Sequence, residues 1–244
     1  MADVNYALAS LVDDVGARLD IGDPTPATTP TEAQIVVWLN FAQLDIANKA
    51  SDYALKTLWA TQSIPKSDFS VLHADIAGIW QATLNTDILR PVSIEYWRAS
   101  TDHPAAVLDR SRIYPVRLMH REVARAAIAS SVMAPTINRP IAWIWEDTIY
   151  FAVADSDAVA DNPYVNDILK IYYIKEPQIM VDTTQENCDL PHVFQEYMVQ
   201  YAVIQAKIQD GKADEAAALW TIYNTGIDKI NQMALTAYMG TRDQ

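Results

Sequence analysis

The clearest structural signal in the sequence is Ile141-Ala-Trp-Ile-Trp-Glu-Asp-Thr-Ile-Tyr-Phe-Ala-Val153. Two apolar and aromatic runs flank a central Glu-Asp pair, and this pattern predicts a β-hairpin. The pair lacks the Asn-Gly signal of the tightest hairpin turns, so the pattern leaves the turn type open. Further strands are predicted on both sides of the hairpin, at 88–97 and at 168–175. The middle of the chain is therefore expected to be rich in β-structure.

Helices are predicted before the strands. Apolar residues recur at helical spacing over residues 4–19, and Asp3 is the predicted N-cap of this helix. A proline-rich loop follows, because proline interrupts the helical hydrogen-bond ladder. Thr31 then opens a second helix, with Gln34 three residues later in the register of a capping box. The pattern between residues 53 and 59 fits a strand and a helix equally well.

Helices also follow the strands. Pro191 suits the first turn of a helix that Asp210-Gly211 ends, and a last helix with one apolar side comes after it. A short helix at about 116–129 is predicted between the strands. Grouped strands with helices at both ends favour an α+β fold over a parallel βαβ repeat. The expected organisation is a helical body of residues 1–50 and 188–244 and a β-rich insertion of residues 51–187 that contains the short helix.

Composition narrows the class of function. The 244 residues include 18 Lys and Arg against 31 Asp and Glu, which gives a formal net charge of −13. Affinity for phosphate comes mainly from cationic side chains, so this balance opposes binding to nucleic acid or an anionic membrane. The six glycines form no loop that could cradle a phosphate, which argues against a nucleotide cofactor. Without a signal-peptide pattern or an apolar run of the ~20 residues that span a bilayer, we expect a soluble protein with no membrane partner.

Catalytic and metal-binding motifs are weak. The four histidines lack the spacing of a zinc site. Asp155, Asp157, Asp161 and Asn162 resemble a calcium loop, but the glycine and the final glutamate of such a loop are missing, which favours a solvated acidic loop. Cys188 lies among acidic residues, and these raise the pKa of a thiol. Carboxylates distant in sequence can converge on a sugar, so a glycan hydrolase is an alternative function.

Five arginines form the main basic feature: Arg110, Arg112, Arg117, Arg121 and Arg125. The last three are spaced four apart, so a helix would carry them along one edge. One interpretation is a solvated helix face. The other is a strip that pairs with carboxylates of a neighbouring subunit, since the guanidinium fork suits a carboxylate. All five are therefore candidates for a subunit interface.

Three segments carry a resemblance to a known family: Trp38-Leu-Asn-Phe-Ala-Gln-Leu-Asp-Ile-Ala47, Ile168-Leu-Lys-Ile-Tyr-Tyr-Ile-Lys-Glu-Pro177, and Leu190-Pro191 followed by Tyr197-Met-Val-Gln-Tyr-Ala202. Together with the hairpin, they make the chain resemble the head-to-tail adaptor (connector) proteins of tailed bacteriophages over about residues 32–230. The region 53–79 is longer and more irregular than the family pattern.

The resemblance implies a structural virion protein rather than an enzyme. It implies a ring, of twelve subunits, that sits beneath the portal protein in the virion neck, extends the DNA channel and docks tail or nozzle proteins. DNA would pass through without specific binding, and assembly would take place in the host cytoplasm. The C-terminal segment often reaches into the portal in this family, which makes Tyr238, Met239 and Arg242 candidates for portal contact, in a segment (234–244) expected to order only on docking. With this resemblance, the alternative hydrolase would be a tail-associated glycan hydrolase. Another neck protein, such as a stopper or a tail terminator, is a further alternative.

Overall fold

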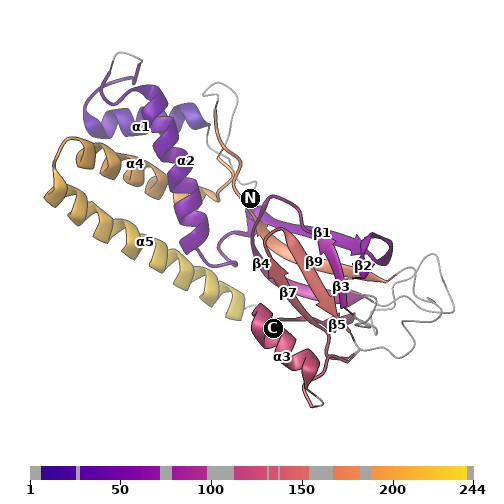
Figure 1. Ribbon diagram of the computed structural model, residues 1–244. Coiled ribbons are helices and arrows are strands. Elements are labelled where there is room, and N and C mark those ends of the chain that lie inside the picture. Colours follow the sequence, from indigo (N-terminus) through magenta and orange to yellow (C-terminus); the bar gives the residue numbers. More distant parts are fainter. Residues whose placement is uncertain are drawn as a thin grey trace. The chain divides into compact units, whose positions relative to one another are not determined.

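The structure is a computed structural model that describes residues 7–25, 28–71, 79–97, 113–130, 132–136, 138–153, 167–181 and 188–240. The chain divides into two compact units (Figure 1). The helical unit comprises Met1–Trp59 and Glu176–Gln244, and the β unit comprises Ala60–Lys175. The fold class is α+β, with helices at both ends and strands in the middle, which confirms the class predicted from the sequence.

The helical unit is built around one central helix, α4, which packs against three others. Buried side chains lie on almost every side of α4, because α1, α2 and α5 surround it. This explains why its sequence lacks a polar face. The elements of the unit are α1 (Leu8–Leu19), α2 (Glu32–Lys49), η1 (Lys56–Leu58), η4 (His192–Phe194), α4 (Gln195–Gln209) and α5 (Ala213–Gly240).

The helix ends follow local chemistry. The Thr31 hydroxyl accepts a hydrogen bond from the Gln34 backbone N–H, and the Gln34 side chain accepts one from the Thr31 backbone, so the predicted capping box is confirmed. Gly211, in the left-handed region with φ of 75°, follows the end of α4 as predicted. The first helix is described from Leu8 onward, and the predicted N-cap Asp3 lies outside the described residues.

The β unit contains two sheets, in the strand orders β1-β9-β4-β5 and β2-β3-β8-β7-β6. The hairpin β7–β8 and the pair β4–β9 are antiparallel, whereas β6 pairs with β7 in parallel. The elements are β1 (Trp59–Pro65), η2 (Lys66–Asp68), β2 (Ser70–Val71), β3 (Ile79–Thr83), β4 (Ile88–Trp97), β5 (Ile113–Pro115), β6 (Arg117–Leu118), α3 (Arg121–Ala129), β7 (Ile141–Trp145), β8 (Thr148–Ala152) and β9 (Ile168–Lys175).

The alternating side chains of β7 and β8 pack into two different hydrophobic cores. Ile149 and Phe151 join a cluster that also contains Tyr96 of β4 and Leu169 of β9, so the two sheets share this core. The intervening residues point to the other face, where Trp143 packs with Ala124 and Ala127 of α3. Because successive side chains of a strand point to opposite faces, one hairpin can hold both the second sheet and the helix α3 (Figure 1).

The predicted hairpin and the strands at 88–97 and 168–175 are confirmed. Glu146 takes the left-handed conformation, with φ of 55°, in the two-residue turn between Trp145 and Thr148. The ambiguous residues 53–59 form a turn, the short helix η1 and the first residue of β1.

Two sequence-based predictions are wrong. The central helix does not begin near residue 116, because the backbone N–H groups of Arg117 and Met119 donate to carbonyls of Pro140 and Ala142. This pairing makes β6 an edge strand beside β7, and α3 begins only at Arg121. The C-terminal segment expected to order only on docking is already helical over 234–240, as the end of α5.

Candidate functional site

The described residues contain no group of three or more His, Cys, Asp or Glu side chains that could hold a metal ion. The acidic loop with Asp155, Asp157, Asp161 and Asn162 lies outside the described residues. None of the described helices combines the length and the apolar character that a membrane-spanning segment requires.

Cys188 is a buried structural thiol. Its Sγ lies 3.4 Å from Gln43 Oε1 and 3.2 Å from Met198 Sδ, and the residue is fully buried. Burial raises the pKa of the thiol to about 12, and the neighbouring Asp189 carboxylate adds to this rise. A thiol that stays protonated is a poor nucleophile, so the arrangement does not suit covalent catalysis.

The outward side of α2 is apolar and lies between two grooves. One groove, of about 520 Å³, separates α2 from the C-terminal half of α4. The other, of about 250 Å³, lies between α2 and residues 176–179. Val37 lines both grooves and is 50% exposed, and Phe41, which lines the second, is 57% exposed. The only carboxylate that lines either groove is Glu176, so neither groove provides the pair of acids that glycoside cleavage needs.

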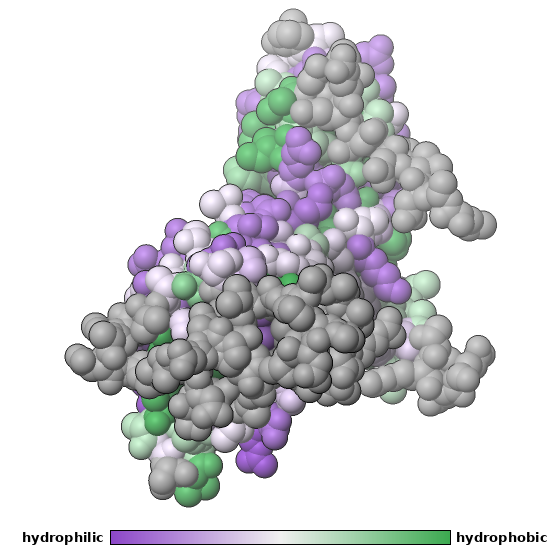
Figure 2. Space-filling view, turned by 90° about the vertical axis from the view of Figure 1, so that its right-hand side faces the viewer, coloured by the Kyte–Doolittle hydropathy of each residue, from purple (hydrophilic) through white to green (hydrophobic). Residues whose placement is uncertain are grey.

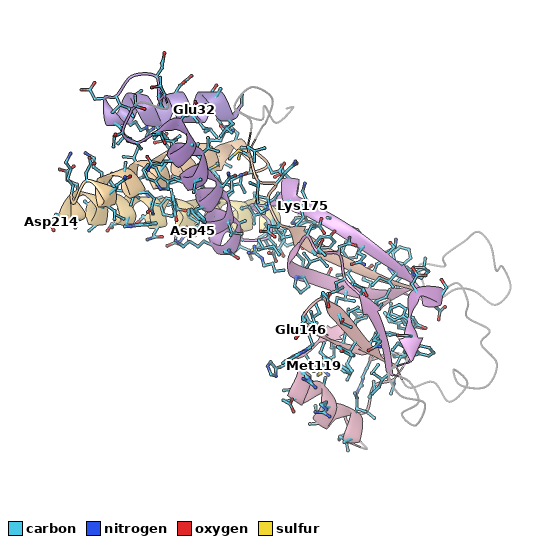
Figure 3. The ribbon with its side chains drawn as sticks, turned by 45° about the horizontal axis from the view of Figure 1, so that its top comes forward. Glu32, Asp45, Met119, Glu146, Lys175 and Asp214 are labelled. Atoms are coloured by element: carbon cyan, nitrogen blue, oxygen red, sulfur yellow. The ribbon has the colours of Figure 1, made fainter. Side chains whose placement is uncertain are left out.

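Charge is absent from most of α2. No charged residue occurs between Glu32, at its first position, and Asp45, near its end (Figure 3). In the space-filling view, apolar residues gather in a patch on the helical unit, beside hydrophilic ones (Figure 2). We name the exposed apolar residues that line the two grooves the α2 surface; they are Val37, Phe41, Ile179 and Ile208.

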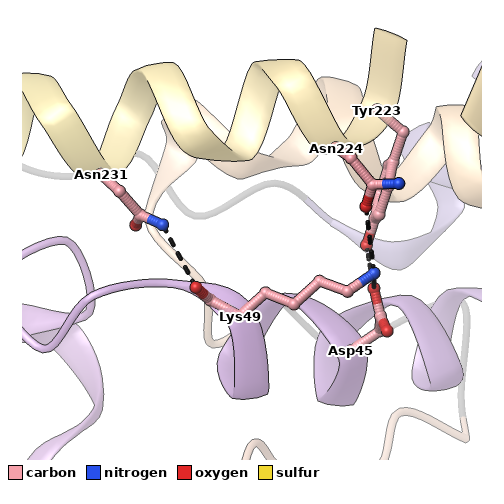
Figure 4. A network of polar contacts seen from close by, with 5 residues as sticks. All are labelled: Asp45, Lys49, Tyr223, Asn224 and Asn231. Atoms are coloured by element: carbon pink, nitrogen blue, oxygen red, sulfur yellow. Dashed lines mark hydrogen bonds and ion pairs between the residues drawn. The ribbon is translucent and has the colours of Figure 1, made fainter. Parts of the chain in front are cut away.

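A polar network joins α2 to α5 (Figure 4). The Tyr223 hydroxyl donates to Asp45 Oδ2 at 2.6 Å, and Lys49 Nζ lies 2.8 Å from the same oxygen. Lys49 Nζ also donates to Asn224 Oδ1 at 3.2 Å, and Asn231 Nδ2 donates to the Lys49 carbonyl at 3.2 Å. Burial, and then the hydrogen bond to Asp45, raise the pKa of Tyr223 well above its usual range. The tyrosine therefore remains a hydrogen-bond donor, and the network positions α5 rather than transferring protons.

Three of the five candidate arginines lie on the β unit within the described residues. Arg121 and Arg125 belong to α3, whereas Arg117 belongs to β6 and does not continue their helix edge. Arg117 pairs in register with Ile141, whose side chain faces α3, so all three arginines belong to the α3 side of the sheet. Arg110 and Arg112 lie outside the described residues.

One arginine of α3 lies against an exposed aromatic ring. The Arg121 guanidinium carbon lies 4.6 Å from the ring centroid of Trp145, which is 48% exposed. None of Arg117, Arg121 and Arg125 forms an ion pair with a carboxylate in the part of the chain that the structure describes. We name Arg121, Arg125 and Trp145 the α3 surface. An arginine stacked on an indole keeps its N–H groups available for a carboxylate.

The end of α5 is the third exposed feature. Tyr238 stacks on Tyr53, with ring centroids 4.1 Å apart, so this portal-contact candidate packs within its own unit. Met239 is 60% exposed and Met233 is 70% exposed. Arg242 lies outside the described residues.

A family profile, the SU10 adaptor protein, matches residues 6–243. The chain belongs to the SU10 adaptor protein family. A search of curated proteins found no match. This family is a phage adaptor family, which confirms the resemblance to the head-to-tail adaptors and supports a structural role in the phage.

Charge is divided unequally in this SU10 adaptor. The helical unit holds seven Lys and Arg against eighteen Asp and Glu, a formal charge of −11, whereas the β unit holds eleven against thirteen, a charge of −2.

The sequence predicts the shared helix edge of the arginines of α3, but the sequence analysis missed the α2 surface. The twelve-residue stretch without charge, 33–44, was the available signal.

Proposed function

We propose that the chain is the subunit of a head-to-tail adaptor ring, with twelve copies in the virion neck beneath the portal protein. The ring extends the DNA channel and docks tail or nozzle proteins, without a cofactor and without catalysis. The observation that carries this proposal is the match of an adaptor family to residues 6–243, nearly the whole chain.

The distribution of charge supports ring assembly. A closed ring needs a heterologous contact, in which a patch of one subunit meets a different patch of the next. Arg121 and Arg125 offer cations without described ionic partners, and the helical unit carries a charge of −11. In this proposal, the β-rich insertion (51–187) presents the arginines and the helical body (1–50 and 188–244) presents the acids.

The same acidity suits passage of DNA. A channel wall of net negative charge repels phosphates that come within a Debye length, about 10 Å at 0.1 M salt. Binding minima along the wall are then weak, so DNA slides through without specific contacts. A charge of −13 per subunit supports this behaviour.

Portal contact is assigned to the end of α5. The stacking of Tyr238 on Tyr53 fixes the helix end, and this leaves Met239 exposed just before Arg242 in the sequence. Each contact is modest, but simultaneous engagement around a ring makes the joint durable.

The test mixes the purified chain with the portal protein of the same phage and images the mixture by negative-stain electron microscopy. We expect portal rings that carry an added ring of density. Arg121→Glu with Arg125→Glu should prevent the added ring, and deletion of residues 241–244 should leave the helical circular dichroism unchanged while weakening docking. Bare portal rings with the wild-type chain at every concentration would contradict the proposal.

A further inference from the structure

The outward side of α2 has the apolar composition of a helix side that is covered by other protein. A helix that is apolar on all sides is normally buried on all sides. In α2, Ile35 and Leu39 face the core and are fully buried, yet Val37 and Phe41 on the opposite side are half exposed or more. The apolar surface continues beyond α2, because Ile208 of α4 is 48% exposed and Ile179 is 68% exposed. Contiguous exposed apolar area of this kind marks an interaction site.

Carboxylates lie at the margins of this apolar surface. Glu32 directly precedes Ala33, which lines the first groove, and Glu176 lines the second groove. Neither forms an ion pair with a residue among those described. An apolar centre with a polar rim is the usual anatomy of a protein interface. A complementary partner surface would carry cations that face these carboxylates and an apolar side chain that packs on the apolar centre.

The α3 surface has that composition. Trp145 supplies an exposed ring, Arg121 supplies a cation against that ring, and Arg125 supplies a second cation one turn later on α3. Tryptophan, arginine and tyrosine are the residues most enriched at the energetic centres of interfaces, where they fill pockets. The end of α5 complements the α2 surface less well. Residues 230–240 contain no charged side chain that could pair with Glu32 and Glu176.

We propose that the α2 surface of one subunit receives the α3 surface of a second copy of this chain, with Trp145 packed beside Phe41 and the arginines facing Glu32 and Glu176. The contact is heterologous, since the two surfaces are different, and every copy carries both. Copies therefore join in series, and the series forms a ring when the rotation between neighbours closes. This inference rests on the proposed ring and specifies which surfaces form its joint.

Cysteine cross-linking tests the joint without altering it. Gln178→Cys places a thiol on the rim of the second groove, and Ala129→Cys places one a turn after Arg125, both at exposed positions. The native Cys188 is fully buried and stays unmodified. Rings assembled with the portal are treated with a short bis-maleimide and separated by denaturing electrophoresis.

The double variant should give a ladder of covalent oligomers up to the ring size. An equal mixture of the two single variants should stop at dimers, because each chain then offers one thiol. The matched control combines Ala129→Cys with Ile222→Cys, at a 58% exposed position of α5 that lines neither groove, and should give no ladder. Rings without a ladder, or a cross-link within single chains, would overturn this joint and leave the ring proposal standing. Absence of rings from the wild-type chain would overturn both.

Charge reversal provides a second readout. Glu176→Arg and Arg125→Glu should each lower the yield of rings by about tenfold or more, because like charges across an interface repel strongly. Their combination should recover yield relative to either single variant. A double variant that assembles no better than the worse single variant would contradict the pairing of these two residues.

Discussion

Replacement of Tyr223 by phenylalanine tests the polar network between α2 and α5. The side chain of Tyr223 is completely buried, and its hydroxyl donates to Asp45 at 2.6 Å. The variant keeps the ring, and with it the edge contacts to Trp220 and Tyr197, and removes only the hydroxyl. Any change in stability therefore reports the hydrogen bond.

The structure sets the expected size of the effect. A hydrogen bond to a charged partner contributes about 1.5–3 kcal/mol. The Asp45 side chain is 28% exposed and keeps Lys49 at 2.8 Å, so its carboxylate stays solvated and paired in the variant. We therefore expect the lower end, about 1.5 kcal/mol. In urea unfolding with a slope of about 2 kcal/mol per molar, the midpoint should fall by about 0.75 M, measured by circular dichroism of the helices.

The control is Tyr150→Phe in the β unit. Tyr150 stacks on Trp143, and its hydroxyl has no hydrogen bond to a described residue, so the midpoint should hardly move. A double-mutant cycle with Asp45→Asn should show coupling between the two positions. An unchanged midpoint for Tyr223→Phe, or additive effects in the cycle, would show that this hydrogen bond does not stabilise the fold.

The pH dependence has a definite sign. The pKa of Tyr223 in the folded chain lies above its ordinary value of 10. Above that pH the unfolded chain loses the proton first, so the free energy of unfolding falls as pH rises. The stabilising contribution is therefore complete at neutral pH. Tyr223→Phe should lose less stability than the wild type between neutral and strongly alkaline pH, and an equal loss in the two proteins would contradict this.

Three further predictions concern single residues. Gly226→Ala should lower the urea midpoint, because a Cβ there would lie 2.0 Å from Tyr197 Cε1. Such overpacking costs about 1–3 kcal/mol, which exceeds the ~1 kcal/mol that alanine gains over glycine in a helix. A higher midpoint would contradict the close packing of α4 and α5. Thr31→Ala should lower the free energy of unfolding by about 1 kcal/mol, because the capping box with Gln34 is lost. An unchanged urea midpoint would contradict a stabilising role for this cap. Cys188 should react with a thiol reagent only after denaturation, and rapid labelling of the folded chain at mildly alkaline pH would contradict its burial and raised pKa.

Elements with local signals were predictable. The capping box at Thr31 and the stop at Gly211 depend on residues within one or two turns. The hairpin at 141–153 depends on alternation and a two-residue connection. Such signals act between near neighbours in the chain, so no knowledge of tertiary structure is needed to read them.

The candidate site was only partly predictable. Arg121 and Arg125 lie on one helix edge, as their spacing indicates, but Arg117 does not. Helical spacing of arginines does not show whether the backbone of the same residues pairs with a neighbouring strand. Here the backbone at Arg117 pairs with β7. Tyr238 likewise became a packed residue because Tyr53, far away in the sequence, lies against it.

The order of helices and strands, the acidic charge and the absence of a phosphate-binding loop follow from the amino-acid sequence alone, since these depend on composition and on local periodicity. Which apolar residues remain exposed depends instead on the packing of distant segments. Ile35 and Val37 are two residues apart on α2 and chemically alike, yet one is fully buried and the other is half exposed. Packing partners come from α4 and other segments remote in the chain, and the helix turns one residue toward them and the other away. The surfaces available for assembly are therefore a property of the folded chain.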